Sequence, residues 1–352
     1  MAYTTINKST EHFNTKTWTG TGDYTTAITG VGFQPDWVWV KNRDVGDDHM
    51  LFDAVRGVTK RLFSNADTAE GTDAQTLTSF DSDGFTTGTS RATGGDSGNK
   101  MVAWNWKAGG AGSANTAGNT NSTVSVNTTA GFSIVKWTGT GSATTVGHGL
   151  GVAPTWIIVK NLADANDWFV YTKAIGYSMS NPDPETDYLK LNQINGRADD
   201  ANAWNDTAPT NQVFSVGSAS NVNGSSDPMI AYCFTDKTGY CKVGSYYGNG
   251  NANGTFIYTG FKPAFVITKK TSGNDEWNIN DTTRDSYGNP LDANLLANTS
   301  AAETDHDRFD AVSNGFKMRT DSGQYNASGS TYIYMAFGQS LVGSNNVPCT
   351  AR

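Results

Sequence analysis

Short apolar runs that end in a lysine recur three times along the chain, at residues 32–42, 151–161 and 260–270. Each run reads as Gly, two residues, Pro, one residue, an aromatic residue, three mostly β-branched or aromatic positions, and Lys. A tight Gly-x-x-Pro turn before a β-branched run predicts a short strand. The runs are almost continuously apolar, which is typical of a strand that is covered on both faces.

Three positions of the run repeat in register: the proline, the aromatic residue two positions later and the closing lysine. They are Pro35, Trp37 and Lys41; Pro154, Trp156 and Lys160; and Pro263, Phe265 and Lys269. A proline at the start of a strand interrupts no ladder, because its missing N–H is not needed there. We therefore expect all nine residues to be structural.

Two further strands keep this register. The first follows the lysine, at residues 49–52, 168–171 and 277–280. The second closes each unit with an alanine beside an aromatic residue, at residues 101–104, 229–232 and 334–337. Units of roughly a hundred residues have the usual size of a domain and are too long for solenoid repeats. The pattern predicts an all-β fold of three tandem copies of an antiparallel β-sandwich unit, of the jelly-roll or lectin-like type.

The predicted organisation is an N-terminal arm (1–12), β-sandwich unit 1 (13–106), a linker (107–131), unit 2 (132–238), unit 3 (239–341) and a C-terminal tail (342–352). The linker consists almost entirely of Ala, Gly, Ser, Asn and Thr, a composition typical of an extended or flexible segment. We expect it to be the protease-sensitive joint. No such spacer separates the last two units, so we expect these to pack as one rigid body.

Composition and charge exclude several classes of function. The formal net charge is −8 and the pI is about 5.0, whereas a nucleic-acid-binding protein needs a basic face. No apolar run approaches the ~20 residues that span a bilayer, and the first residues lack the pattern of a signal peptide. Cys233, Cys241 and Cys349 are too few for a disulfide framework. We expect synthesis in a reducing cytoplasm, without membrane insertion.

One polar pattern recurs in two of the units. Asp53 stands three residues before Arg56, and Asp281 stands three residues before Arg284 at the same register. A carboxylate and a guanidinium at this spacing can form a bidentate pair that closes a loop. The alternative is a contact with a polar ligand. We favour the loop clamp.

No pattern of catalytic, metal-binding or cofactor-binding residues stands out. The chain has no Gly-x-Ser-x-Gly motif. The Asp and His clusters at residues 44–49 and 305–307 lack zinc spacing, and residues 81–84 are only a fragment of a calcium loop. We expect no cofactor, no metal and no catalytic residue, and no ligand-binding residue can be assigned.

Acidic and aromatic residues leave two alternatives open. Asp48, Asp167 and Glu276 precede the second strand of each unit. A repeated acid at a strand start is most simply structural, but a glycosidase also needs paired carboxylates. Trp137, Trp204 and residues 246–247 could stack on sugars, although most aromatic residues recur in register and so belong to a core.

Long runs of residues resemble a family of uncharacterised, repeat-containing virion structural proteins of tailed, mostly marine, bacteriophages. The runs are residues 2–10, 30–43, 49–57 and 79–85. Members are sometimes labelled tail fibre or lectin-like. The resemblance covers nearly the whole chain and implies a virion protein that is assembled in the host cytoplasm and released by lysis. It supplies no catalytic residue.

These observations lead to one principal hypothesis and two alternatives. The first is a non-enzymatic structural protein on the surface of the virion, of the tail-fibre or receptor-binding type. The second is a capsid-decoration or head-appendage protein, and the third a glycan-hydrolysing virion enzyme that uses Asp167 or Glu276. The expected partners are other virion proteins, further copies of the chain in a trimer and a host surface glycan, with no nucleic acid.

Overall fold

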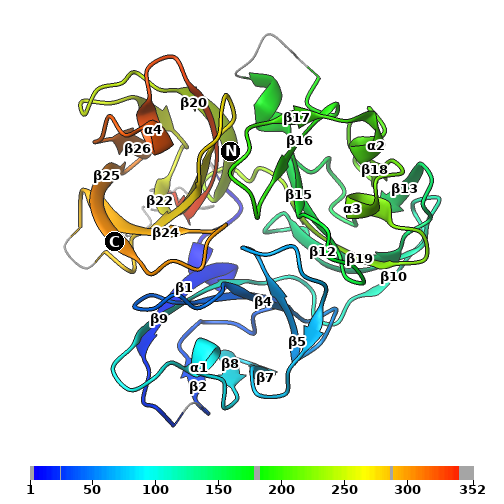
Figure 1. Cartoon of the computed structure of the whole chain (residues 1–352), viewed down its shortest axis with the longest axis horizontal. Coiled ribbons are helices and arrows are strands. Elements are labelled where there is room, and N and C mark those ends of the chain that lie inside the picture. Colours follow the sequence, from blue (N-terminus) through cyan, green and yellow to red (C-terminus); the bar gives the residue numbers. More distant parts are fainter. Residues whose placement is uncertain (1–3, 24, 178–182, 286–287, 341–352) are drawn as a thin grey trace.

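The protein is built almost entirely of antiparallel strands, in the arrangement shown in Figure 1. The structure is a computed structural model and describes residues 4–23, 25–177, 183–285 and 288–340. Every named pair of neighbouring strands is antiparallel in the part of the chain described. The all-β sandwich prediction is confirmed. None of the helices in these residues is long and apolar enough to cross a membrane.

Unit 1 contains a main sheet with the order β1-β9-β3-β4-β5-β6 and a smaller sheet, β2-β8-β7. Its elements are β1 (Phe13–Thr19), β2 (Ala27–Thr29), β3 (Trp37–Asn42), β4 (Met50–Asp53), β5 (Lys60–Phe63), β6 (Gly71–Thr72), β7 (Leu77–Asp81), β8 (Gly84–Thr87), α1 (Arg91–Gly94) and β9 (Lys100–Trp106). The short helix η1 (Ser9–Glu11) precedes β1.

Unit 2 has a main sheet with the order β10-β11-β12-β19-β14-β15-β16-β17 and the small sheet β13-β18. Its elements are β10 (Ser113–Asn115), β11 (Ser122–Asn127), β12 (Phe132–Thr138), β13 (Thr144–Gly147), β14 (Trp156–Asn161), β15 (Phe169–Thr172), η2 (Lys173–Tyr177), β16 (Asp187–Lys190), β17 (Ala198–Asp199), α2 (Ala201–Trp204), β18 (Val213–Val216), α3 (Ser220–Asn223) and β19 (Pro228–Phe234).

Unit 3 is one continuous ladder, β20-β27-β22-β23-β24-β25-β26-β21. Its elements are β20 (Cys241–Tyr247), β21 (Phe256–Tyr258), β22 (Lys262–Lys270), β23 (Trp277–Asp281), β24 (Leu291–Leu296), β25 (Thr304–Val312), β26 (Gly315–Met318), α4 (Gly323–Asn326) and β27 (Thr331–Gln339). The order β1-β9-β3-β4-β5 of unit 1 thus recurs as β12-β19-β14-β15-β16 and as β20-β27-β22-β23-β24. That the three units are copies of one sequence stays a prediction.

The register of the central strands corrects one part of the sequence alignment. The ladder places Met335 at the position that Trp104 and Tyr232 occupy in the first two units. The alignment of residues 334–337 with the earlier closing strands is therefore wrong by two residues. A shift of two residues keeps every side chain on the same face of the sheet, so the hydrophobic pattern could not reveal it.

The three units surround one central core (Figure 1). In each unit, one face of the main sheet points to this centre, and the other face covers a core within the unit itself, here called its inner core. Trp37 and Trp39 of β3 face this centre, whereas Val38 and Val40 face the separate core inside unit 1. Units 2 and 3 have inner cores of the same kind. The central strands are thus buried on both faces, which explains why their sequences are apolar without alternation.

The predicted linker at residues 107–131 is not a linker. It contains β10 and β11, and β11 pairs with β12 along its whole length. Val124 is buried in the inner core of unit 2. The composition misled because small polar residues satisfy their backbone groups in a ladder as well as larger ones do. The rigid body predicted for units 2 and 3 also includes unit 1, because one core joins all three.

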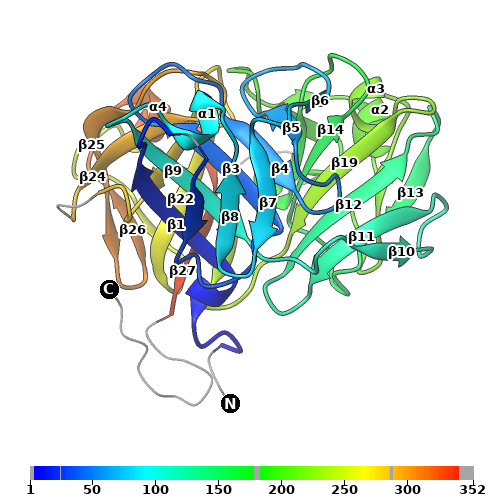
Figure 2. The same cartoon turned by 90° about the horizontal axis from the view of Figure 1, so that it is seen from below.

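The predicted N-terminal arm packs against the protein's own fold in its described part. Ile6 is buried in the central core. The Ser9 N–H donates to Oε1 of Gln339, the last residue of β27, at 2.7 Å. The first and last elements therefore meet at one end of the molecule, at the bottom of Figure 2. The predicted C-terminal tail, residues 342–352, lies outside the described residues.

Candidate functional site

The loop that leaves β4 is closed by Asp53 and Arg56. Asp53 Oδ1 accepts the backbone N–H groups of Val55 (3.1 Å) and Arg56 (2.8 Å), which curls the chain back on itself. Asp53 Oδ2 accepts from Arg56 Nε, and both side chains are fully buried. The pair thus forms the loop clamp described by the sequence hypothesis.

Every remaining donor of Arg56 is also used within the protein. It donates to the carbonyls of Leu51 and Lys60, both at 3.0 Å, to Glu70 at 3.2 Å and to Tyr232 Oη at 3.5 Å. Burial acts to lower the pKa of Arg56, but the nearby charges of Asp53, Tyr232 and Glu70 outweigh burial and raise this pKa. A guanidinium held in this way has no free edge for a ligand.

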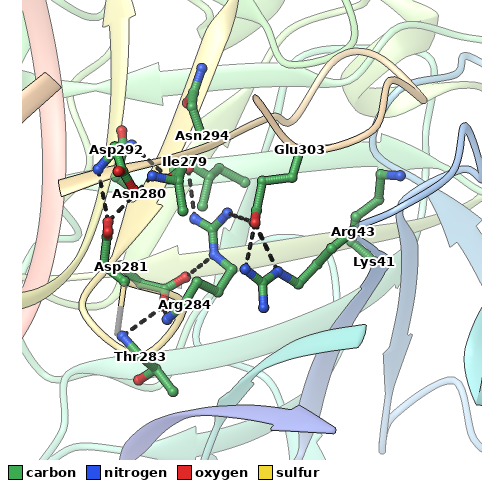
Figure 3. A network of polar contacts seen from close by, with 12 residues as sticks. Lys41, Arg43, Ile279, Asn280, Asp281, Thr283, Arg284, Asp292, Asn294 and Glu303 are labelled. Atoms are coloured by element: carbon green, nitrogen blue, oxygen red, sulfur yellow. Dashed lines mark hydrogen bonds and ion pairs between the residues drawn. The ribbon is translucent and has the colours of Figure 1, made fainter. Parts of the chain in front are cut away.

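The second pair repeats this geometry in unit 3. Asp281 Oδ1 accepts the Arg284 backbone N–H at 2.9 Å, and Asp281 Oδ2 accepts from Arg284 Nε at 2.5 Å. Arg284 also donates to the Ile279 carbonyl (2.9 Å) and to Glu303 (2.6 Å). Figure 3 shows Glu303 between Arg284 and Arg43 of unit 1, to which it is also bonded.

Each clamp receives a third partner from a neighbouring unit, which sequence reasoning missed. Tyr232 Oη, on β19 of unit 2, donates to Asp53 Oδ2 at 2.8 Å. Trp104 Nε1, on β9 of unit 1, donates to Asp281 Oδ2 at 2.9 Å. The two donors occupy the same register position, and this was the signal available in the sequence. The clamps are therefore junctions between units.

Unit 2 lacks the carboxylate, and its neighbour lacks the donor. Thr172 and Ile175 stand at the clamp positions of unit 2. Met335 of unit 3 has the register position of Trp104 and Tyr232, and a thioether has no proton to donate. Ile175 and Met335 are both buried in the central core. The polar group and its partner are thus present together or absent together, as burial of a charge requires.

A second set of contacts also links the units. Trp168 Nε1 of unit 2 donates to the Phe63 carbonyl of unit 1 at 2.9 Å. Trp277 Nε1 of unit 3 donates to the Lys190 carbonyl of unit 2 at 2.8 Å. In unit 1, His49 stands at the register position of these two tryptophans. Units 2 and 3 therefore each hold the edge of the preceding unit.

His49 completes this set in unit 1. Its Nδ1 accepts from Trp39 Nε1 at 2.8 Å, so the proton of the neutral ring is on Nε2. Burial lowers the pKa of His49 well below its ordinary value, and the Leu296 carbonyl of unit 3 opposes this shift. A histidine held neutral in this way is a structural residue.

The three register lysines are buried at the same junctions. Lys160 Nζ donates to the Asp67 carbonyl of unit 1 (3.1 Å), and Lys269 Nζ to the Ile194 carbonyl of unit 2 (2.8 Å). Lys41 donates to carbonyls of its own loop. Burial lowers the pKa of each of the three lysines to about 8. All nine register residues, prolines and aromatics included, are buried.

The acids before the second strands do not face one another as a catalytic pair would; each holds an asparagine of its own unit. Asn65 Nδ2 donates to Asp48 at 2.7 Å and Asn192 Nδ2 donates to Asp167 at 2.7 Å. Glu276 accepts from Asn298 in the same way. Asp167 also pairs with Lys190 at 2.7 Å.

The other candidates from the sequence are mostly internal. Trp137, Trp204 and Tyr246 are buried, and only Tyr247 of the proposed sugar-stacking residues is exposed. Within the described ranges, no group of three or more His, Cys, Asp or Glu is arranged to hold a metal ion.

One pair of acids was missed entirely. Asp285 Oδ2 accepts the backbone N–H groups of Asp292 (2.9 Å) and Ala293 (3.3 Å). Burial and then the neighbouring Asp292 carboxyl raise the pKa of Asp285 to about 7. The protonated form of Asp285 is therefore favoured near neutral pH. Their spacing in sequence has no signature that would have identified them.

Comparison with known proteins places the chain in a family without assigning an activity. A family model described as "Domain of unknown function (DUF7483)" matches residues 8–340. No curated protein matches the chain.

Proposed function

Because the chain belongs to the DUF7483 family, described only as a domain of unknown function, we propose a function from its geometry. We propose a non-enzymatic structural protein that is displayed on the surface of a tailed-bacteriophage particle, as an appendage of the tail-fibre or receptor-binding type. It acts by presenting a rigid surface. The resemblance of residues 30–43 and 49–57 to virion proteins supports a location on a phage particle. The geometry supports a role as a rigid block displayed on its surface.

The observation that carries this proposal is that the buried polar side chains hold the units together. The buried charges of the clamps and the register lysines are bonded to carbonyls and partner side chains at the unit junctions. This is the organisation of a block held rigid by cross-unit contacts rather than of a cleft that reacts with a substrate. The elements next to the chain ends meet at one end, which leaves the opposite end free for display.

A decoration role on the capsid is the second candidate. The same meeting of Ser9 and Gln339 suits a compact block that attaches through one end, and the described residues contain no elongated shaft. The glycan-hydrolase alternative has weaker support, because Asp167 and Glu276 are bonded to Asn192 and Asn298. A homotrimer stays a proposal, but three-way packing is already achieved within one chain.

The test has two parts. The protein is first sought on purified particles, and purified protein is then used to compete with the particles for attachment to host cells. Mass spectrometry of purified particles should detect the chain, and a particle reconstruction should place it on the tail. The purified protein, added in excess, should reduce adsorption of particles to host cells. Heat-unfolded protein at the same concentration is the control.

Other outcomes separate the alternatives. Density on the capsid with unchanged adsorption would favour decoration. Absence from particles would contradict both. Release of sugar from host polysaccharide, lost in Asp167→Asn, would favour the enzyme. Light scattering of the purified protein would give the mass of either one chain or three chains, which tests the trimer.

A further inference from the structure

Three exposed aromatic side chains lie near one edge of unit 3. They are Tyr247 at the end of β20 and Phe256 and Tyr258 on β21. Phe256 is 47% exposed and Tyr258 is 60% exposed. The Thr255 hydroxyl donates to the Tyr247 carbonyl at 2.8 Å, so the end of β20 lies near the start of β21.

The outer edge of β21 is unpaired in the described part of the chain. β21 ends the ladder of unit 3, and Ile257 pairs with Phe316 on its inner side. In an antiparallel ladder, alternate residues direct their N–H and C=O groups to opposite sides. Since Ile257 bonds toward β26, the backbone groups of Phe256 and Tyr258 point outward. Among these groups, the Tyr258 carbonyl accepts a hydrogen bond from Tyr334 Oη at 3.4 Å.

The equivalent edge of unit 2 is covered by the chain itself. There β13 pairs with β18 in the same register, and its outward residues are Thr145 and Gly147. The Thr120 N–H donates to the Thr145 carbonyl at 3.0 Å, and the Ser122 hydroxyl donates to the Gly147 carbonyl at 3.0 Å. Thr120 forms a parallel bridge to this strand. An extended segment of small polar residues therefore fits this edge.

Unit 1 offers a contrast. The outward residues of its strand β2 are Ala27 and Thr29, whose small side chains expose little apolar surface. In unit 3 the same two positions hold Phe256 and Tyr258. Bare strand edges are normally protected against pairing, and a large exposed aromatic pair beside a bare edge marks a binding surface.

The charges around this edge indicate the chemistry of the partner. A cavity of about 300 Å³ beside Tyr258 is also lined by Lys237 and Lys242, and Lys317 is the cross-strand neighbour of Phe256. The acid at the cavity, Asp236, is bonded to Lys242 at 2.7 Å. A basic margin on a chain of net charge −8 favours a partner that carries carboxylates.

We propose that the outer edge of β21 binds an extended, acidic segment of another polypeptide, which adds to unit 3 as a further strand. Main-chain hydrogen bonds to Phe256 and Tyr258 supply the pairing, as in other cases of strand addition. The two aromatic rings pack on side chains of the added strand, and Lys237 attracts its acidic end. The inference does not depend on the proposed function.

The probe is a synthetic peptide with the sequence of residues 115–122 followed by two glutamates. Its parallel orientation, copied from Thr120 on β13, would bring the glutamates to the Tyr258 end. Hydrogen exchange of the full chain is measured with and without the peptide. The amides of residues 256 and 258 should exchange several-fold more slowly with peptide, and those of residues 27 and 29 should not change. The same peptide ending in two lysines should protect less.

Matched variants test the mode of binding. Tyr258→Pro removes an outward N–H that makes no ladder bond to β26, so the fold should persist and protection should be lost. Thr29→Pro makes the same change on the equivalent edge of unit 1 and should leave protection intact. Each variant is checked by its melting temperature.

Three results would overturn the proposal. One is an unchanged exchange rate at residues 256 and 258 with millimolar peptide. Another is equal protection at residues 27 and 29. The third is a dimer in sedimentation that dissociates in the Tyr258→Pro variant, which would make a second copy of this chain the occupant instead.

Discussion

At the scale of single residues, the phenol of Tyr232 joins unit 2 to a carboxylate of unit 1. Its hydroxyl donates to Asp53 Oδ2 at 2.8 Å in a fully buried site. Tyr232→Phe removes only this hydroxyl, and the loss of a hydrogen bond to a charged group costs about 1–3 kcal/mol. Denaturant unfolding should show this decrease. Tyr258→Phe, at an exposed hydroxyl, is the control and should change stability little; equal effects in the two variants would contradict the junction.

The acid pair of unit 3 makes stability depend on pH. The folded pKa of Asp285 is about 7, above the unfolded value of about 3.9. The folded state therefore holds a proton that the unfolded state releases, and stability falls as pH rises from about 4 to about 7. Asp285→Asn removes this titration, so its melting temperature should drop less than that of the native protein between pH 5 and pH 8.

A second variant tests whether the pair is responsible. Asp292→Asn removes the neighbouring like charge and should flatten the same pH profile, though less, because burial of Asp285 remains. An unchanged profile in both variants would show that the pKa of Asp285 is not raised in solution.

The residues that sequence analysis placed well are those whose role is local. Pro35, Trp37 and Lys41 recur with a fixed spacing, and a fixed spacing along a strand fixes which face each side chain takes. Trp104 and Asp281 are far apart in sequence, and their hydrogen bond exists only because two sheets meet in the centre. Such contacts between units have no spacing rule, so the clamps could be predicted directly, whereas the only sequence signal for their third partners was a shared register position.

At the scale of elements, β11 shows the limit of reading composition alone. Residues 107–131 have the composition of a flexible spacer, yet β11 adds to the sheet of unit 2. The information that a strand follows lay in the alternation of Val124 and Val126 with polar residues, which the surrounding glycines and asparagines obscured.

This pairing leads to a prediction for limited proteolysis. A nonspecific protease should not cut within β11 before the whole protein unfolds, because a paired strand does not enter a protease site without local unfolding. Val124→Asp places a charge in the inner core of unit 2 and should open the segment to cleavage. Early cleavage there in the native protein would contradict the strand.

At the scale of the whole molecule, one core shared by three sheets predicts one unfolding transition. A chain truncated to units 2 and 3 (residues 107–340) would expose the faces that now contact Trp37 and Trp39. Such a surface far exceeds the apolar patches that monomeric proteins tolerate. The truncated chain should aggregate or bind a hydrophobic dye, whereas the full chain should melt in a single calorimetric step. Two separate transitions in the full chain would show independent units instead.

The contact between Ser9 and Gln339 has a topological consequence. A chain in which the elements next to its two ends meet can be joined into a circle and reopened elsewhere with its packed contacts kept. Joining the ends by a short polar linker and opening the chain between Gly109 and Gly112, in the turn before β10, would give a circular permutant that begins with unit 2 and ends with unit 1. The order of the three units along the chain can then change while their packing stays the same, so that any of the three units can come first.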